Sequence, residues 1–167
     1  MRSRRVRVGQ ARGSHLPVLM KLLSMTTGPV LELGCGYNST PVMHWACFPT
    51  SRRLLTMESN PDFFEFANAY IADFHEVRCV PTWDSVSVDV SEPWSLALVD
   101  HSPETARAPL AGRLAHAEYV IVHDTQRQRD GRTPRFPEFK FEWKYTQPRV
   151  HTSVLSNVHD LKGFTIP

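Results

Sequence analysis

Short apolar runs alternate with helix-like segments over most of the chain, and this alternation limits the possible folds more than any other feature of the sequence. The runs are rich in Val, Leu and Ile and are too short for buried helices, so they are predicted to be strands: 30–33, 53–58, 77–80, 95–100 and 119–124. Helices are predicted before and between them, at 14–24, 42–48, 60–74 and 102–115. Strands that alternate with helices form a mostly parallel sheet with helices on both faces.

The pattern changes near the end of the chain. Residues 126–137 are polar and rich in arginine, and they predict a loop. In the segment that follows, charged residues alternate with four aromatic ones: Phe139, Phe141, Trp143 and Tyr145. This period of two is typical of a strand with one apolar face, and a turn at 147–149 leads back into residues 150–156. A closing antiparallel hairpin is therefore expected.

Capping residues mark two helix starts. Ser14 is placed to cap the helix at 14–24, and Asn60 followed by Pro61 is typical of the start of the helix at 60–74. The second helix has one apolar face, whose side chains are predicted to lie in the core: Phe63, Phe66, Ala67, Tyr70, Ile71 and Phe74.

The length and the charge distribution indicate one domain with a basic extension. A chain of 167 residues has the size of a single domain. Five arginines lie in the first 15 residues and four in 126–137, so the positive charge belongs to two segments. This argues against a nucleic-acid-binding surface over the whole domain. We expect a flexible basic tail at 1–13 and one domain at 14–167.

Other classes of protein are disfavoured by what the sequence lacks. Cys35, Cys47 and Cys79 have neither the number nor the spacing of a disulfide framework or a zinc site. No apolar run is long enough to span a membrane, and the first residues do not form an apolar signal segment. A cytoplasmic protein without a membrane partner is the expectation.

Polar residues or glycines follow every one of the five predicted strands. They are Gly34 and Gly36, Glu58, Trp83 and Asp84, Asp100 and His101, and His123 and Asp124. The carboxyl ends of parallel strands meet at one edge of the sheet, where α/β proteins bind their ligands. These residues therefore predict a binding site at that edge.

The glycine-rich turn after the first strand limits the kind of ligand. Residues 32–39 lack the third glycine or alanine of the dinucleotide fingerprint, which disfavours a pyrophosphate. Glu58 ends the next strand, 22 residues after Gly36, where an acidic side chain can accept hydrogen bonds from both hydroxyls of a ribose. A nucleoside-containing ligand is the better match.

These motifs resemble those of the class I S-adenosylmethionine-dependent methyltransferases. Residues 30–36 are similar to the first motif of that family, 56–61 to its second motif, and the closing hairpin to its two added strands. The resemblance covers residues 28–160 and implies a Rossmann-like methyltransferase fold, with a mostly parallel, doubly wound sheet that ends in an antiparallel hairpin. It also implies ten contacts with S-adenosylmethionine: Glu32, Gly34, Gly36, Asn38, Ser39, Glu58, Ser59, Trp83, Asp84 and Asp100.

Residues 99–101 and 122–125 are similar to small-molecule O-methyltransferases of the catechol type, which hold a magnesium ion at the corresponding strand ends. This similarity implies a metal site at Asp100 and Asp124, helped by His123 or Thr125. Oxygen ligands suit Mg²⁺ or Ca²⁺, and a histidine ligand favours Mn²⁺ or another transition-metal ion. Two departures stand out, because Thr125 replaces an asparagine and Pro103 replaces a catalytic lysine. His101 and His123, with Asp100, are the candidate catalytic residues, since histidine titrates near neutral pH.

The resulting hypothesis is an enzyme that methylates an oxygen, or less readily a nitrogen, of a small molecule. Two alternatives stay open: a binding module that has lost catalysis, which Pro103 favours, and an RNA methyltransferase whose arginine tail contacts phosphates, through Arg2, Arg4, Arg5, Arg7 and Arg12. If residues 126–137 cover the site, their arginines favour an acidic acceptor: Arg127, Arg129, Arg132 and Arg135. The oligomeric state is left open.

Overall fold

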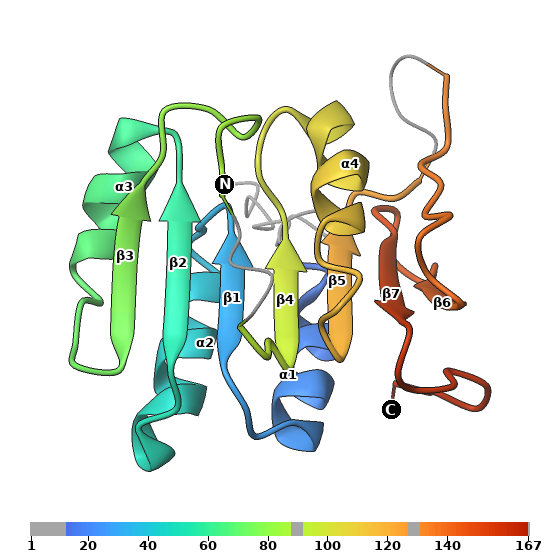
Figure 1. The fold of residues 1–167 in the computed structure, drawn as a ribbon, viewed down its shortest axis with the longest axis horizontal. Coiled ribbons are helices and arrows are strands. Elements are labelled where there is room, and N and C mark those ends of the chain that lie inside the picture. Colours follow the sequence, from blue (N-terminus) through green and yellow to red (C-terminus); the bar gives the residue numbers. More distant parts are fainter. Residues whose placement is uncertain (1–12, 88–91, 127–130, 167) are drawn as a thin grey trace, which may run out of the picture.

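Seven strands form a single sheet in the computed structural model, which describes residues 13–87, 92–126 and 131–166 (Figure 1). Their order across the sheet is β3-β2-β1-β4-β5-β7-β6. The strands are β1 (Val30–Leu33), β2 (Leu54–Glu58), β3 (His75–Cys79), β4 (Leu96–Val99), β5 (Tyr119–His123), β6 (Phe141–Tyr145) and β7 (Thr152–Ser156). The first five run parallel, and β7 is antiparallel to both β5 and β6. The predicted doubly wound sheet with a closing hairpin is confirmed.

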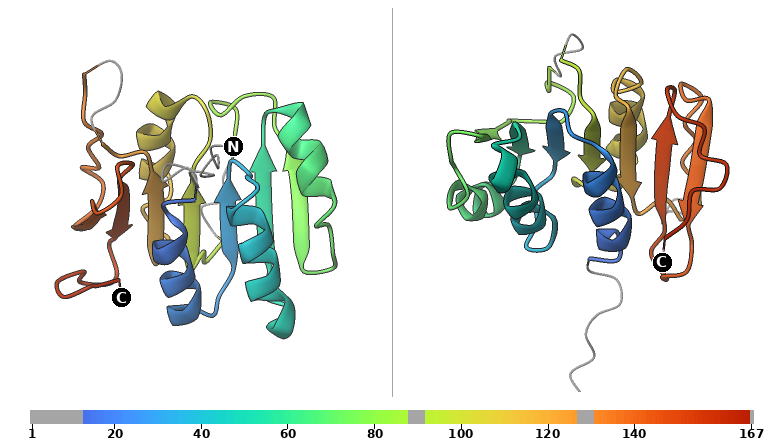
Figure 2. Two further views of the ribbon diagram at one scale, coloured as in Figure 1. Left: turned by 180° about the vertical axis from the view of Figure 1, so that it is seen from behind. Right: turned by 90° about the horizontal axis from the view of Figure 1, so that it is seen from below.

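Helices cover both faces of the sheet (Figure 2). They are α1 (Leu16–Met25), α2 (Ser39–Cys47), α3 (Pro61–Asn68) and α4 (Arg107–Gly112), with short 3-10 turns at Phe48–Thr50 and Glu104–Ala106. The first three helices lie on one face and α4 lies on the other. Among the helices of the described residues, none is long and apolar enough to cross a lipid bilayer.

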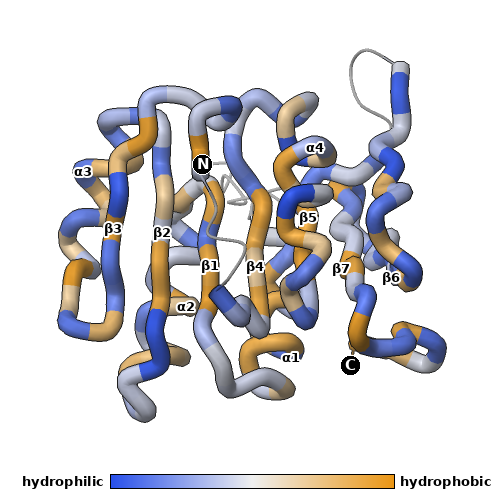
Figure 3. Tube along the Cα trace, in the orientation of Figure 1, coloured by the Kyte–Doolittle hydropathy of each residue, from blue (hydrophilic) through white to orange (hydrophobic). Residues whose placement is uncertain are grey.

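The central strands are buried on both faces, which explains why their sequences are mostly apolar and do not alternate (Figure 3). The exception in the interior of a strand is Glu32 in β1, which is buried as well. One core cluster lies under α1 and α2 and includes Leu19, Met43 and Leu98. The other lies under α4 and includes Leu110 and Leu114. The two clusters pack against opposite faces of the sheet.

The position of the site follows from the order of the strands. From β1 the chain moves outward through α2 to β2, whereas from β4 it moves in the opposite direction through α4 to β5. The loops after β1 and β4 therefore diverge to opposite faces, although the two strands are neighbours. Such a switch point leaves a crevice at the carboxyl edge of the sheet.

Two expectations about the helices were wrong. Ser14 does not cap α1, whose N-cap residue is His15, because the Ser14 hydroxyl contacts His123. The phenylalanines of α3 are half-buried, and Ala67 is the buried residue of that helix. The helix ends at Asn68, and it packs against β2 and β3 at the edge of the sheet, which leaves its outer side chains in contact with solvent. The Asn60 cap is confirmed, with its side chain accepting hydrogen bonds from the N–H groups of residues 62 and 63.

Gly34 is a position where a side chain cannot be accommodated. Its φ is +93°, and a Cβ atom there would lie 2.5 Å from His101 Cα. We expect Gly34→Ala to lower the free energy of unfolding by roughly 3 kcal/mol or more, through a left-handed backbone and a clash with backbone atoms. Gly163→Ala is the matched control, since its φ is +86° but nothing lies within 4 Å, and it should cost only about 1 kcal/mol. Denaturant unfolding measures both, and equal losses would contradict the close contact.

Candidate functional site

Two adjoining pockets open at the carboxyl edge of the sheet, and Asp100 lines both. The first, the Glu58 pocket, measures ≈ 460 Å³ and is lined by Cys35, Glu58, Ser59, Asn60, Pro61, Phe63, Asp100, His101 and Ser102. The second, the Asp124 pocket, measures ≈ 310 Å³ and is lined by Gly13, His15, Gly36, Asn38, Ser39, Asp100, His123, Asp124 and Val150. The structure thus brings together most of the residues that the sequence placed at the strand ends.

Glu58 organises the first pocket. Its carboxylate accepts backbone hydrogen bonds from Cys35 at 2.9 Å and from Ser59 and Asn60 at 2.7 Å each. These bonds tie the turn after β1 to the start of α3. Three of about four lone-pair positions are used in this way, so the carboxylate can still accept a hydrogen bond from a ligand hydroxyl.

The turn after β1 rests on a buried polar layer. The Gly36 N–H donates to Thr40 Oγ1 at 3.0 Å, and the Thr40 hydroxyl donates to Glu32. Glu32 is fully buried and lines neither pocket. Burial raises the pKa of its carboxyl to about 7. Glu32 was predicted to contact the cofactor, but in the structure it stabilises the turn after β1 through its hydrogen bond with Thr40.

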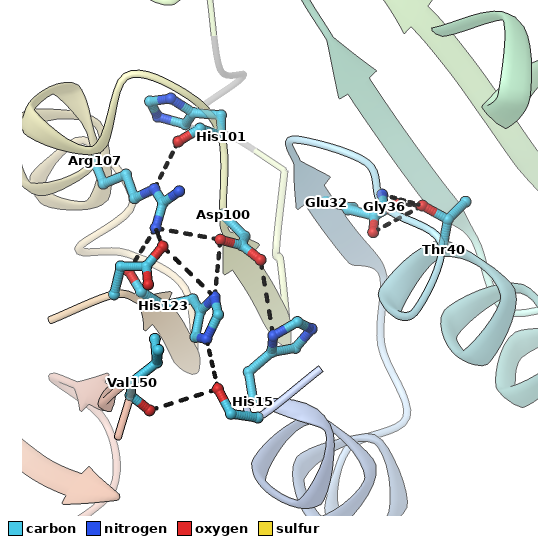
Figure 4. A network of polar contacts seen from close by, with 11 residues as sticks. His15, Glu32, Gly36, Thr40, Asp100, His101, Arg107, His123 and Val150 are labelled. Atoms are coloured by element: carbon cyan, nitrogen blue, oxygen red, sulfur yellow. Dashed lines mark hydrogen bonds and ion pairs between the residues drawn. The ribbon is translucent and has the colours of Figure 1, made fainter. Parts of the chain in front are cut away.

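Arg107, the first residue of α4, joins the ends of β4 and β5 (Figure 4). Its Nη1 lies 3.2 Å from Asp100 Oδ1 and 2.6 Å from Asp124 Oδ2. The same guanidinium donates to the backbone carbonyls of His101 and His123. Burial opposes ionisation of Asp100, but the hydrogen bond from His123 and the charge of Arg107 lower the pKa of its carboxyl below the usual value.

His123 lies between Asp100 and the start of α1. Its Nδ1 is 3.0 Å from Asp100 Oδ1, and its Nε2 is 2.9 Å from Ser14 Oγ. The His15 ring packs edge-on against His123, with ring centroids 4.6 Å apart. Burial lowers the pKa of His15 to about 4, so this imidazole is neutral at neutral pH. Two histidines and a carboxylate therefore face one another across the Asp124 pocket.

His101 has a different environment. Its ring stacks on Trp83, with centroids 4.1 Å apart, and neither ring nitrogen has a hydrogen-bond partner among residues 13–87, 92–126 and 131–166. Burial, together with the charge of Arg107, lowers its pKa to about 4. Of the two candidate bases, His123 has a carboxylate partner, Asp100, within hydrogen-bond distance, whereas His101 has none among the described residues.

The remaining predicted residues divide into two groups. Asn38 and Ser39 line the Asp124 pocket at the start of α2, and Ser59 lines the Glu58 pocket. Trp83 is buried against His101, whereas Asp84 is exposed beyond β3 and lines neither pocket.

The two arginine-rich segments contribute little to the described part of the site. The arginines at 2, 4, 5, 7, 12, 127 and 129 lie outside the described residues. Arg132 and Arg135 are exposed and line neither pocket.

The expected metal site between Asp100 and Asp124 does not fit the observed geometry. Their mutual repulsion requires a cation, and Arg107 already supplies one, with the same nitrogen contacting both carboxylates. Thr125, a proposed helper, uses its hydroxyl to accept a hydrogen bond from Ser153. A metal ion bridging the two aspartates would have to displace the guanidinium.

Sequence reasoning missed Ser14, His15 and Arg107. The first two precede a helix, where serine suggests only a cap, and Arg107 belongs to a helix without any motif. Their roles depend on contacts between distant segments, such as the one between Ser14 and His123, which are 109 residues apart.

Removing the Arg107 guanidinium should strongly destabilise the protein. Arg107→Met leaves two partly buried carboxylates without their cation, and we expect a loss of about 3 kcal/mol in the free energy of unfolding. Arg113→Met, on an exposed side chain just after the same helix, removes one hydrogen bond to the Val86 carbonyl and should cost about 1 kcal/mol. Urea unfolding at neutral pH measures both values. A small decrease in the free energy of unfolding of Arg107→Met would show that the two aspartates are stable without the guanidinium.

The buried Glu32 should make stability depend on pH. Its pKa is raised in the folded state, so the folded protein retains a proton that the unfolded chain loses, and stability falls as the pH rises from about 4.5 to about 7. Glu32→Gln removes this component. The variant should gain on the order of 3 kcal/mol relative to wild type between about pH 5 and about pH 8. Comparison at each pH cancels the contribution of the buried histidines, and a difference that does not change with pH would contradict the prediction.

Comparisons with known proteins support the fold. No protein-family model and no curated protein matches the sequence. Among solved structures, cofactor-bound Rv0187 from MTB is similar over 93% of this chain and 84% of that one, with a TM-score of 0.63 and 22% identity. A protein from Klebsiella pneumoniae, provisionally assigned as an O-methyltransferase, is similar over 94% and 84%, with a TM-score of 0.58 and 18% identity.

A variant of MtNAS in complex with S-adenosylmethionine is also similar, over 85% of this chain and 61% of that one, with a TM-score of 0.51 and 11% identity. These likenesses agree with the strand order and with the antiparallel hairpin at the end of the sheet. The chain therefore has the Rossmann-like fold of the S-adenosylmethionine-dependent methyltransferases.

Proposed function

We propose that this protein is a methyltransferase that transfers the methyl group of S-adenosylmethionine to an oxygen of a small molecule. The observation that carries the proposal is the pair of adjoining pockets at the switch point of the sheet, with Asp100 in the wall of both. A methyl transfer needs two ligands held side by side, and this edge offers one pocket for each.

The Glu58 pocket is the place for the nucleoside half of the cofactor. Glu58 has an acceptor position left for a ribose hydroxyl beside Ser59. Trp83 and Asp84, the residues expected to contact the adenine, do not line this pocket, so neither is assigned to the adenine. Gly34 and Gly36 let the turn after β1 approach the methionyl half, next to Asn38 and Ser39. The bound S-adenosylmethionine supplies an activated methyl group on a sulfonium. The carboxylate of Asp100 would then lie near that positive charge.

The Asp124 pocket is the place for the acceptor. In the reaction the acceptor oxygen forms a bond to the methyl carbon, the bond from carbon to sulfur breaks with its electron pair remaining on sulfur, and the hydroxyl proton is lost. In the absence of a metal ion this proton passes to His123 or Asp100, which line the pocket together. His101 is disfavoured for this role because it is stacked under Trp83.

The proposal is tested by titration calorimetry and by methyl transfer. We expect one molecule of S-adenosylhomocysteine to bind per chain, and labelled methyl groups from S-adenosylmethionine to appear on a hydroxylated acceptor from a broad panel. Absence of binding by folded protein at up to about 1 mM ligand would refute the cofactor. Binding without any turnover would favour the alternative of a cofactor-binding module.

A substitution at Glu58 should weaken cofactor binding. Glu58→Gln removes the charge that strengthens the hydrogen bond from a ribose hydroxyl, and a charge-assisted bond is worth about 1.5 to 3 kcal/mol, so the dissociation constant for S-adenosylhomocysteine should rise roughly tenfold or more. Glu76→Gln, on an exposed carboxylate of β3, is the matched control and should bind normally. Thermal unfolding of each variant checks the fold, since glutamine also disturbs the backbone bonds of Glu58. An unchanged dissociation constant would place the ribose elsewhere.

A further inference from the structure

Three possible metal ligands converge beside the Asp124 pocket. His15, Asp100 and His123 each offer a ligand atom, and these atoms all lie within 4.8 Å of one another. They come from three separate elements: the N-cap of α1, the residue after β4 and the last residue of β5. Figure 4 shows the His123 and His15 rings next to each other, each facing one oxygen of the Asp100 carboxylate. The convergence is thus produced by the tertiary fold and not by a local turn.

His15 is the residue of the three whose buried ring lacks hydrogen-bond partners in the described protein. Its side chain is 3% exposed, and neither ring nitrogen has a hydrogen-bond partner in the part of the chain that the structure describes. Leaving a buried polar group without a partner costs about 1 to 3 kcal/mol. The ring nevertheless points Nδ1 toward Asp100 Oδ2, at 3.7 Å. A bound ion would satisfy this nitrogen.

The local charge is compatible with a cation at this position. Arg107 contacts Asp124 Oδ2 and Asp100 Oδ1, which leaves Asp100 Oδ2 facing His15. With both imidazoles neutral, the charges of Asp100, Asp124 and Arg107 sum to one net negative charge. The Ser14 hydroxyl is hydrogen-bonded to Nε2 of His123. In the tautomer in which Nε2 carries the proton and donates to Ser14, Nδ1 has a free lone pair directed toward Asp100 and can bind a metal ion.

We propose that His15, Asp100 and His123 bind one divalent transition-metal ion. Two imidazoles and one carboxylate suit first-row transition ions, with Zn²⁺ bound more tightly than Mn²⁺, whereas Mg²⁺ prefers oxygen ligands. Three protein ligands leave coordination positions open toward the Asp124 pocket. Binding of the ion is a property of these side chains and does not require the proposed function. Its catalytic role rests on the proposed function: with Asp100 and His123 engaged as ligands, the ion would replace them by lowering the pKa of an acceptor hydroxyl, whose proton would leave to water.

The site differs from the one expected from sequence in two of its ligands. Asp124 is held by Arg107, and His15, which was not among the candidates, takes its place. Asp100 and the helper His123 were expected, and so was a transition-metal ion if a histidine served as a ligand.

The test uses the full-length protein and the metal alone. After dialysis against a chelator, the protein is titrated with Co²⁺, followed by visible absorption, and with Zn²⁺, followed by calorimetry. We expect one ion per chain, Co²⁺ absorption bands of a nitrogen- and oxygen-ligated site, and no competition by an excess of Mg²⁺. His15→Ala and His123→Ala should each weaken binding at least tenfold, since even outer contacts of metal ligands are worth about 10- to 100-fold.

His116→Ala is the matched control, because His116 is exposed in the loop between α4 and β5. It should leave the affinity and the stoichiometry unchanged. If His15→Ala does not fold, His15→Gln and Asp100→Asn take its place, and an increase in the unfolding temperature of wild type with Zn²⁺ provides a second measurement. Each variant is checked by thermal unfolding before titration.

The possible results separate the two proposals. An unaltered affinity in folded His15→Ala or its replacements, or loss of binding in His116→Ala, overturns the metal site. Absence of a saturable Co²⁺ spectrum in a protein that binds S-adenosylhomocysteine overturns the metal site alone. A metal spectrum in a protein that does not bind S-adenosylhomocysteine supports the site and refutes the methyltransferase proposal.

Discussion

The guanidinium of Arg107 is the interaction on which the rest of the site depends. Asp100 and Asp124 end neighbouring strands, and their carboxylates would repel each other in a partly buried position without a cation between them. Arg107 offers a planar set of N–H donors, and it uses them for two carboxylates and two backbone carbonyls at once. A lysine has one nitrogen and could not hold both strand ends in this way. Asp124 adopts a left-handed backbone with φ of 59°, which aspartate tolerates better than most residues, and the arginine fixes the side chain that this turn presents.

A second constraint acts below the turn after β1. The Gly36 N–H donates a hydrogen bond to the Thr40 hydroxyl, which in turn donates to the Glu32 carboxyl. The same carboxyl accepts a hydrogen bond from Thr56 at 2.8 Å. Thr56 in turn contacts His75 on β3. This layer gives polar partners to a carboxyl that has no access to water, and it ties β1, β2 and β3 together beneath the ligand side of the turn. Because the pKa of Glu32 is about 7, small changes in its surroundings alter its charge, and the turn above it is the part of the site most directly coupled to that charge.

The sequence predicted the elements and the strand ends better than the contacts between them. The five parallel strands were predicted from their apolar runs, because burial on both faces requires apolar side chains at most positions. The hairpin was predicted from its alternating residues, because burial on one face requires an apolar side chain at every second position. The apolar face of α3 was expected in the core, but a helix at the edge of a sheet meets a partner on one side only, and pattern alone does not tell edge from centre. Glu58, Asp100 and His123 were identified because parallel strands present their ends together. His15 and Arg107 were not, since each is positioned by tertiary packing and carries no local signal.

Asp100 connects the two halves of the site electrostatically. It lines both pockets, and Arg107 and His123 fix its orientation, so it cannot turn toward one ligand at the expense of the other. If the neighbouring pocket holds S-adenosylmethionine as proposed, the one net negative charge of the cluster of Asp100, Asp124 and Arg107 would attract its sulfonium in the absence of an ion. With a divalent ion the cluster becomes positive and would repel that sulfonium, unless an acceptor oxygen is bound as an anion and cancels the excess. In the metal-loaded state a methyl donor would therefore be best accommodated together with a deprotonated acceptor, which is the pair of ligands that the reaction requires.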